Sequence, residues 1–200
     1  MNAYRRRVLE HLRALLAPIA PVGRALDYGS GDGWFAHSLL AEGLIEEIVA
    51  VDVQRREHHF IEPQLYDGER LPFDDRSFDL VYAVDVLHHT PDPAASLRDL
   101  LRCSRRHFLL KDHNHDTALG KWTLALLDEA GNRKFGVPSL YHYQRRWNWL
   151  PVIEEEGFEE QERRAKILIE ERPLLRWFVN EFQFVGRWSR AEAACEDVSA

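Results

Sequence analysis

The fold is decided by one stretch of sequence, Arg24-Ala25-Leu26-Asp27-Tyr28-Gly29-Ser30-Gly31-Asp32-Gly33. A short apolar run ends there in three glycines, each separated from the next by one residue. Glycine lets the backbone turn sharply, and without a Cβ atom it also lets a ligand approach closely. An apolar pattern at helical spacing then follows over residues 33–43. We therefore predict a strand at 24–28, a ligand-binding loop and a helix at 33–43.

Four further apolar runs end in acidic or polar clusters. Strands are predicted at 46–52, 59–66, 78–84 and 106–111, and the clusters after them are Asp52, Asp67-Gly68, Asp85 to His89 and Lys111-Asp112-His113. Together with a predicted helix at 92–103, this alternation indicates right-handed crossovers and a mainly parallel sheet. Open sheets of this class bind ligands at the carboxyl ends of their strands. The five clusters therefore predict one shared ligand site.

The remaining segments extend this α/β pattern. Apolar residues at helical spacing predict helices at 4–17, 116–130 and 144–156. Residues 158–169 and 181–188 are predicted to be two more strands, which would form an antiparallel pair in a mixed sheet. Only residues 54–57 separate the second and third predicted strands, so that crossover is short.

Composition limits the class of protein. The chain has 200 residues and 45% hydrophobic residues, which suits one domain with a substantial core. Its net charge of -7 argues against a nucleic-acid partner, because binding phosphates requires many Lys and Arg contacts. No run approaches the roughly 20 apolar residues of a membrane span. Arg5 to Arg7 precede an apolar stretch that is too interrupted for a signal peptide. Cys103 and Cys195 are too far apart to suggest a zinc knuckle or a disulfide framework, so we expect a cytoplasmic protein.

The glycine loop indicates what kind of ligand it holds. A dinucleotide-binding loop spaces its glycines G-x-G-x-x-G, whereas here they occupy 29, 31 and 33 and Trp34 follows. Asp27 and Asp32 would also repel a pyrophosphate. A zwitterionic ligand without phosphate suits the loop better. Asp52 comes about 20 residues later, as expected of a carboxylate that accepts hydrogen bonds from ribose hydroxyls. The alternatives are a purely structural turn and a helix-capping aspartate.

Four motifs in order resemble a known family. They are Asp27-x-Gly-x-Gly-x-Gly33, Ala50-Val51-Asp52, Tyr66 to Phe73, and Ser77-Phe78-Asp79-Leu80-Val81 followed by Asp85-Val86-Leu87-His88-His89. This set resembles class I S-adenosylmethionine-dependent methyltransferases, most closely the type 11 subgroup, over about residues 20–112. The resemblance implies a Rossmann-like, doubly wound, seven-stranded mixed sheet in a single domain, with S-adenosylmethionine as cofactor.

The resemblance also implies roles for individual residues. Gly29, Gly31 and Gly33 would line the methionine part of the cofactor. The ribose would lie at Asp52, the adenine edge at Asp67 and Gly68, and the sulfonium beside Asp85. Four neighbours complete the predicted cofactor site: Asp27, Ser30, Val53 and Val86. The short second crossover departs from the family pattern and leaves the wall of the adenine pocket undefined.

Histidines near the ends of the fourth and fifth strands are the candidates for chemistry. Methyl transfer is an in-line displacement, so most of the rate gain comes from holding the acceptor in place. A base is needed only if the acceptor loses a proton. Histidine can be a neutral base near pH 7. We predict His113 as the first choice, with His88, His89 and Lys111 as further catalytic candidates. Hydrogen-bonded surface histidines and a sheet-capping lysine are the alternatives.

The acceptor is predicted less sharply. Val84-Asp85-Val86-Leu87 lacks the Asn-Pro-Pro-Tyr type of sequence of enzymes that methylate nucleic-acid amines, so we expect an oxygen or carbon atom of a small molecule. Aromatic residues concentrate in the second half, where they either pack the core or form a lid from Tyr141, His142, Tyr143 and Trp147. Arg145-Arg146 and Arg172 to Arg176 are either solvated or phosphate-binding.

Two other functions stay open. His88-His89 and His113-x-His115-Asp116 would suit a metal hydrolase, but no third ligand has a recognisable spacing, so we predict no metal. The second alternative is a non-catalytic S-adenosylmethionine-binding protein. The expected organisation is a lid helix or homodimer contact at 1–20, a cofactor core at 21–112, acceptor-side elements at 113–190 and a flexible tail at 191–200.

Overall fold

One sheet forms the centre of the molecule. The computed structural model describes residues 3–132 and 140–191, so the predicted tail beyond 191, Cys195 and part of the loop before His142 lie outside the described residues. The strands are β1 (Val22–Tyr28), β2 (Ile45–Asp52), β3 (Gln64–Leu65), β4 (Phe78–Val84), β5 (Ser104–His115), β6 (Gln144–Arg145), β7 (Phe158–Ala165) and β8 (Gln183–Arg190). Their order is β3-β2-β1-β4-β5-β8-β7, and β6 pairs with β5 off this path. The first five in this order are parallel, while β8 is antiparallel to both β5 and β7. The predicted doubly wound mixed sheet is confirmed.

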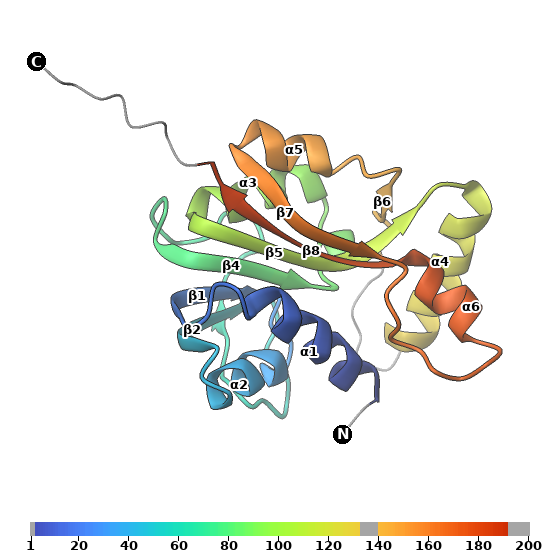
Figure 1. The fold of residues 1–200 in the computed structure, drawn as a ribbon, viewed down its shortest axis with the longest axis horizontal. Helices are drawn as coiled ribbons and strands as arrows, with labels where there is room; N and C mark the ends of the chain where they lie inside the picture. Colours follow the sequence, from blue (N-terminus) through green and yellow to red (C-terminus); the bar gives the residue numbers. More distant parts are fainter. Residues whose placement is uncertain (1–2, 133–139, 192–200) are drawn as a thin grey trace, which may run out of the picture.

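Helices cover both faces of the sheet. They are α1 (Ala3–Leu16), α2 (Trp34–Ala41), α3 (Pro93–Cys103), α4 (Ala118–Asn132), α5 (Leu150–Glu155) and α6 (Arg176–Val179), with 3₁₀ turns η1 (Leu87–His89) and η3 (Asn180–Phe182). In Figure 1, α1 and α2 lie on one side of the sheet and α3 and α5 on the other. Helices α4 and α6 lie beyond the end of the sheet towards which the parallel strands point. No helix within the described ranges has the length and apolar character needed to cross a membrane.

A hydrophobic core lies on each side of the sheet. On one side, Leu97 and Leu100 of α3 pack with Ile153 of α5, and all three are fully buried. On the other side, Leu12 of α1 and Leu39 of α2 pack against the strands. Each such side chain contributes about 1.5–3 kcal/mol when buried. The second core fixes α1 against the sheet, and the first turn of this helix thereby reaches the carboxyl ends of the strands.

Helix α4 approaches β5 closely through a line of residues four apart. A Cβ atom on Gly120 would lie 3.0 Å from Cε1 of Phe182 and 3.3 Å from Cβ of His115, so a larger residue would have no room. Leu124 is buried on the same line, and Asp128 comes next on it. The opposite face of the helix is exposed, with Leu119 77%, Trp122 76% and Leu126 73% accessible. The helix therefore directs a carboxylate towards the sheet.

Two secondary-structure predictions were wrong in part. The strand predicted at 59–66 is ordered only as β3, because Pro63 cannot donate to a ladder and the N–H of Phe60 bonds to the carbonyl of Asp32 instead, at 2.7 Å. The helix predicted at 144–156 begins only at Leu150. Residues 144–145 pair with the carboxyl end of β5, which runs on to His115, and Arg146 and Trp147 then turn the chain with positive φ.

The aromatic residues of the second half divide between the core and the surface. Trp147 packs on Phe184, and Trp188 packs on Phe108. By contrast, Trp177 and Phe178 are 72% and 60% exposed, like Trp122. Of the two alternatives, packing applies to Trp147, Phe184, Trp188 and Phe108, whereas Trp122, Trp177 and Phe178 are exposed.

Candidate active site

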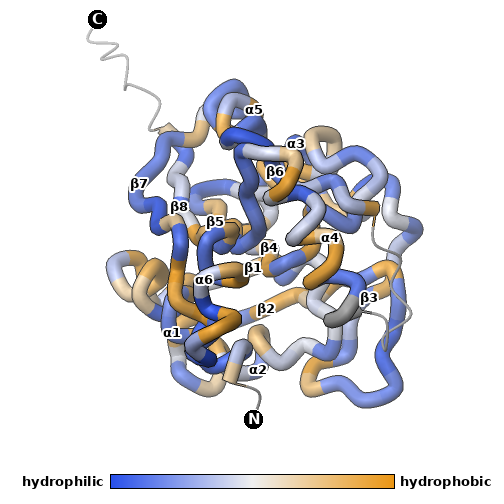
Figure 2. Tube along the Cα trace, turned by 90° about the vertical axis from the view of Figure 1, so that its right-hand side faces the viewer, coloured by the Kyte–Doolittle hydropathy of each residue, from blue (hydrophilic) through white to orange (hydrophobic). Residues whose placement is uncertain are grey.

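The five predicted clusters meet at one edge of the sheet. Strands β3, β2, β1, β4 and β5 are consecutive neighbours and run parallel, so their carboxyl ends lie side by side. Figure 2 looks onto this edge, with the apolar strands in the centre and β6 and α4 beside it. The predicted common rim is confirmed, and each cluster can be placed on it.

The glycine loop makes a tight turn after β1. Gly29, Gly31 and Gly33 all have positive φ, between 61° and 71°. The N–H groups of Gly29 and Ser30 both donate to the carbonyl of Val51, at 2.9 and 3.0 Å. A Cβ atom on Gly29 would lie only 2.2 Å from Cγ2 of Val86, whereas one on Gly31 would meet nothing within 4 Å. Gly29 is thus needed for packing, and Gly31 borders open space.

Asp52 is held against the glycine loop. One carboxylate oxygen accepts the N–H of Gly31 at 2.8 Å, and the other accepts the N–H of Gln54 at 3.0 Å. The side chain is oriented by these two bonds, and each oxygen keeps a further lone pair. This geometry leaves the carboxylate able to accept bonds from a pair of ribose hydroxyls.

Two buried polar atoms beside the loop have no partner. Within the described residues, neither Oδ2 of Asp27 nor Oγ of Ser30 has a hydrogen-bond partner. Burial raises the pKa of Asp27 to about 7. A hydrogen bond with Tyr82 opposes this rise, and Oδ2 of Asp27 and Oγ of Ser30 are each left able to bond to a ligand. A carboxylate and a hydroxyl suit the ammonium end of an amino acid, and with Asp52 they fit S-adenosylmethionine.

The adenine end of the predicted site is a short shelf beside Asp52. A Cβ atom on Gly68 would lie 3.2 Å from Cγ1 of Val53, so these two residues are in contact. Val53 is 60% exposed, and an oxygen of Asp67 accepts the N–H of Glu69 at 2.9 Å. The shelf is open, as expected from the short second crossover.

Asp85 is the centre of a buried ionic cluster at the end of β4. It has φ of 53°, a conformation that is uncommon for any residue except glycine. Its carboxylate accepts hydrogen bonds from the hydroxyl of Tyr4 and from Nζ of Lys111. Lys111 is fully buried, and its Nζ also bonds to Tyr4 Oη at 2.7 Å and to Gln183 Oε1 at 2.6 Å. Tyr4 therefore ties α1 to the rim.

The three candidate histidines converge next to this cluster. The ring centroid of His88 lies 4.1 Å from that of His89 and 5.0 Å from that of His113. One oxygen of Asp112 serves two of them, with His88 Nδ1 at 2.6 Å and His113 Nδ1 at 3.3 Å. The same nitrogen of His113 is 3.8 Å from Asp85.

The electrostatics of two of these histidines differ. Burial by itself would lower the pKa of His88, but the charge and hydrogen bond of Asp112 outweigh it and raise this pKa to about 10. The pKa of Asp112 is in turn far below its usual value, because the charge of His88 and two hydrogen bonds outweigh burial. Burial lowers the pKa of His113, and the charge of Lys111 lowers it further against the bond to Asp112. At pH 7 His88 is therefore cationic and His113 is neutral.

Sequence reasoning missed Tyr4 and Asp128. Asp128 of α4 places one oxygen 3.8 Å from Nε2 of His88 and 3.9 Å from Nε2 of His89, and its other oxygen accepts the hydroxyl of Tyr143 at 3.1 Å. A signal existed, since Asp128 follows the apolar Leu124 by four residues and so shares the inward face of α4. No pattern in the sequence links Tyr4 to Asp85, 81 residues later.

Asp128 is also a possible third metal ligand, which the sequence analysis could not identify. The ligand atoms of His88, His89 and Asp128 lie within 4.8 Å of one another, as do those of His88, Asp112 and His113. His115, by contrast, turns away from the other histidines and bonds through Nδ1 to the carbonyl of Thr117 at 3.1 Å. The prediction that the chain holds no metal stays a prediction.

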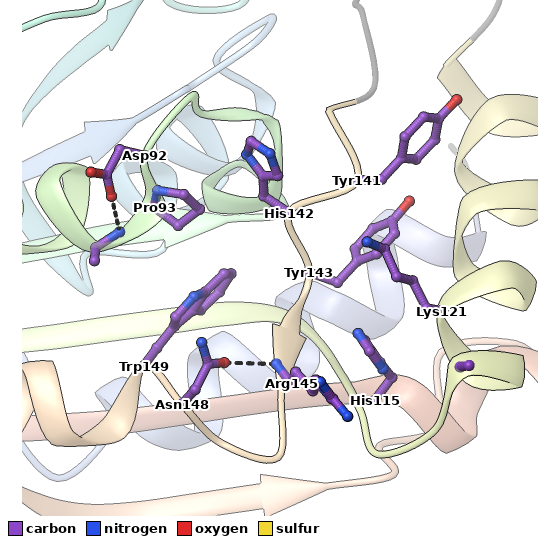
Figure 3. A pocket seen from close by; sticks show the side chains of 12 residues that line it. Asp92, Pro93, His115, Lys121, Tyr141, His142, Tyr143, Arg145, Asn148 and Trp149 are labelled. Carbon is purple, nitrogen blue, oxygen red and sulfur yellow. Dashed lines mark hydrogen bonds between the residues drawn. The ribbon is translucent and has the colours of Figure 1, made fainter.

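A cavity of about 480 Å³ lies on the far side of Tyr143 from the histidines. Tyr143 is 5.2 Å from His88 and 6.0 Å from His113 between ring centroids, and it forms part of the cavity wall. Figure 3 shows the lining, which comes from the start of α3, the end of β5, α4 and the segment around β6. Tyr141 and His142, two residues of the predicted lid, line this cavity, whereas Trp147 packs in the core.

Comparison with known proteins agrees with this geometry. The family model described as "Methyltransferase domain" matches residues 1–164. The sarcosine/dimethylglycine N-methyltransferase of Halorhodospira halochloris is 28% identical over 171 residues, which cover 78% of this chain and 58% of that protein. The chain thus spans little more than half the length of this relative.

Solved structures share the fold at low sequence identity. An S-adenosylmethionine-dependent methyltransferase from Mesorhizobium loti has a TM-score of 0.66 at 18% identity, over 91% of this chain and all of the other. The magnesium protoporphyrin IX methyltransferase of Synechocystis with bound SAH has a TM-score of 0.64 at 15% identity, over 94% and 84% of the two chains. The fold, the rim and the family model agree, and the chain belongs to the methyltransferase domain family.

Proposed function

We propose that this chain transfers a methyl group from S-adenosylmethionine to an oxygen or carbon atom of a small-molecule acceptor. The observation that carries the proposal is the rim itself, where the open space at Gly31, the oriented Asp52 and the unpartnered Asp27 are neighbours. When bound, the cofactor supplies an electrophilic methyl group on sulfur. Relatives named for sarcosine and for magnesium protoporphyrin IX support a small acceptor.

His113 is the proposed general base. With Nδ1 bonded to Asp112, Nε2 is left as its basic nitrogen, and the low pKa of this histidine keeps it neutral at pH 7. Its position 3.8 Å from Asp85 places it beside the predicted sulfonium position. A base at this point suits an acceptor that must lose a proton, such as a hydroxyl or an acidic C–H group. An unprotonated amine, like the acceptor for which the Halorhodospira relative is named, would not need it.

Lys111 and His88 act on Asp85 and His113 rather than on the acceptor, whereas His89 faces the acceptor. The three hydrogens of Lys111 Nζ are matched by three protein acceptors, so we assign it a positioning role towards Asp85. His88 is cationic and bonded to Asp112, which it holds in place for His113. His89 lies beside His88 and is 15% exposed, so it can contact an acceptor.

Helix α1 is proposed as the lid of the cofactor site. Its first turn contacts the rim twice, through Tyr4 on Asp85 and through Arg5 on Asp32 at 2.7 Å. The guanidinium of Arg5 also lies 5.8 Å from the ring of Trp34, at the start of α2. These contacts tie the helix to residues on both sides of the glycine loop. They favour the lid over the alternative of a dimer contact.

Calorimetry with the cofactor and a labelled-methyl assay test the proposal together. S-adenosylmethionine and its demethylated product should each bind with one site per chain, and label should pass to phenolic or enolic acceptors in a panel that also holds sarcosine and other amines. Failure of both cofactor forms to bind at millimolar concentration would remove the proposal. Binding with label transfer to amines alone would replace oxygen and carbon by nitrogen as the acceptor atom. Binding without transfer to any acceptor would favour a non-catalytic binding protein.

A further inference from the structure

Two cationic side chains, both exposed, line the cavity behind Tyr143. Lys121 of α4 and Arg145 of β6 both line it, and neither forms an ion pair within residues 3–132 and 140–191. The one carboxylate in the lining is Asp92, which caps α3 by accepting the N–H groups of Ala94 and Ala95, each at 3.0 Å. Two unpaired cations in one concave site favour an anion.

The charges of the two cations act on the same space. The charges of Lys121 and Arg145 both act on His115, and Figure 3 shows the amino group of Lys121 directed towards Tyr143 and Arg145 beside Asn148. His115 is buried, and its Nδ1–H donates to the carbonyl of Thr117, so in the neutral ring Nε2 is an acceptor and offers no hydrogen to an anion. Burial lowers the pKa of His115, and the charges of Lys121 and Arg145 lower it further, although the bond to Thr117 opposes them. The two side chains that can attract an anion here are therefore Lys121 and Arg145.

Three aromatic side chains, Tyr141, Tyr143 and Trp149, also line the cavity. Trp149 and Tyr143 are only 3% and 6% exposed. The ring of Tyr141 lies 6.4 Å from that of Tyr143 between centroids, and its hydroxyl donates to Glu129 at 3.0 Å. A volume of about 480 Å³ is within the usual range for a small-molecule site. Flat aromatic walls and two cations suit a ring that carries a negative group.

The cavity is also next to the proposed catalytic histidines. Tyr143 lines the cavity, and its ring is also a neighbour of the rings of His88 and His113. We propose that this cavity binds the anionic end, a carboxylate or a phosphate, of a ring-bearing methyl acceptor, with Lys121 and Arg145 as its charge partners. That the ligand is the acceptor rests on the proposed function. The binding itself does not depend on methyl transfer, so it can be tested without the cofactor.

Nuclear magnetic resonance of the ¹⁵N-labelled protein tests the site directly. The six tryptophans give six indole signals, and the Trp149→Phe variant identifies the one in the cavity. Sodium benzoate, phenyl phosphate and neutral benzamide are titrated at constant ionic strength. Both anions should shift the Trp149 signal saturably, and benzamide should bind about tenfold more weakly or not at all. The tighter of the two anions identifies the acceptor's charged group.

Matched variants locate the charge partners. Lys121→Met and Arg145→Met should each weaken binding of the better anion about tenfold, because each removes a charge-assisted bond. Lys166→Met is the control, since Lys166 is an exposed lysine outside the cavity lining that pairs with Glu181. It should leave anion binding unchanged, and all three variants should keep the cofactor affinity of the wild type.

Three results would overturn the inference. They are equal binding of benzamide and the anions, no saturable shift of the Trp149 signal, and unchanged anion binding in both cavity variants. If the wild-type protein does not bind S-adenosylmethionine, the proposed function is contradicted. That result does not affect the proposed anion site. The two proposals therefore fail in distinguishable ways.

Discussion

The two halves of the rim are built in different ways. The half at β1 and β2 is made from backbone turns, in which Asp52 binds a loop N–H group only 21 residues away and glycines supply the positive φ angles. The half at β4 and β5 is made from side chains that meet over long distances in sequence. Lys111 bonds to Gln183, 72 residues away, and Tyr4 bonds to Asp85, 81 residues away.

This difference has a physical reason. The cofactor half can be recognised from a short stretch of sequence, because a tight turn needs particular residues at fixed spacing. The acceptor half consists of side chains that the order of the strands brings together. A short sequence motif does not predict these contacts. We therefore expect changes in the first half to affect cofactor affinity and changes in the second to affect turnover.

The largest expected effect is on turnover. Replacing His113 by Gln should lower kcat by about 10²- to 10⁴-fold and leave cofactor affinity unchanged, because it removes the proposed base. The activity of the wild type should fall only on the acid side, as pH drops through the lowered pKa of His113. The measurement is the pH dependence of labelled-methyl transfer to an acceptor found in the panel.

His107→Gln is the control for this change. His107 lies near the start of β5, away from the rim, and bonds to Ser189. Equal losses of activity in the two variants would show that the β5 histidines serve stability only.

The next effect concerns the ribose carboxylate. Replacing Asp52 by Ala should weaken cofactor binding by about 1.5–3 kcal/mol, since it removes charge-assisted hydrogen bonds. Asp52→Asn keeps one oxygen acceptor without the charge, so its cofactor affinity should lie between those of the wild type and Asp52→Ala. Calorimetric titration of all three proteins checks the order, and wild-type affinity in Asp52→Ala would contradict the assignment.

A pair of glycine variants sharpens the comparison further. Gly31 and Gly43 both have positive φ and open space where a Cβ would be, but only Gly31 lies on the rim. Alanine at either site should cost about 1–2 kcal/mol of stability, because of the left-handed backbone. Only Gly31→Ala should weaken cofactor binding, by about tenfold or more, because its methyl group enters the space of the ligand. Equal cofactor affinity in the two variants would show that the space at Gly31 is not used.

The last expected effect is a pH dependence of stability. The folded pKa of His88, about 10, lies above its usual 6.5, so the protonated form stabilises the fold. That contribution is fully present below pH 6.5 and is lost as pH rises through 10. Denaturant unfolding at pH 6.5, 8 and 10 should therefore show a steeper fall in stability for the wild type than for His88→Gln. Parallel curves would mean that His88 is not held as a cation.

The cofactor half of the rim could be predicted from the sequence more completely than the acceptor half, because its contacts are local. The glycine loop, Asp52 and Asp85 were placed correctly on one rim, because strand alternation and turn residues are local signals. Asp128 and Tyr4 were missed, because their partners are set by how α4 and α1 pack. The strand at 59–66 was predicted too long because the apolar content of this segment was given more weight than Pro63. The helix at 144–156 was predicted too long because its helical periodicity gave no sign that β6 pairs with β5.

A crystal structure with the demethylated cofactor bound tests the central claim most directly. We predict ribose hydroxyls on Asp52, the amino-acid end against Gly31 and Asp27, adenine near Asp67, and the sulfur facing Asp85 and His113. A cofactor found elsewhere, or crystals grown at saturating ligand with nothing bound along this rim, would contradict the account.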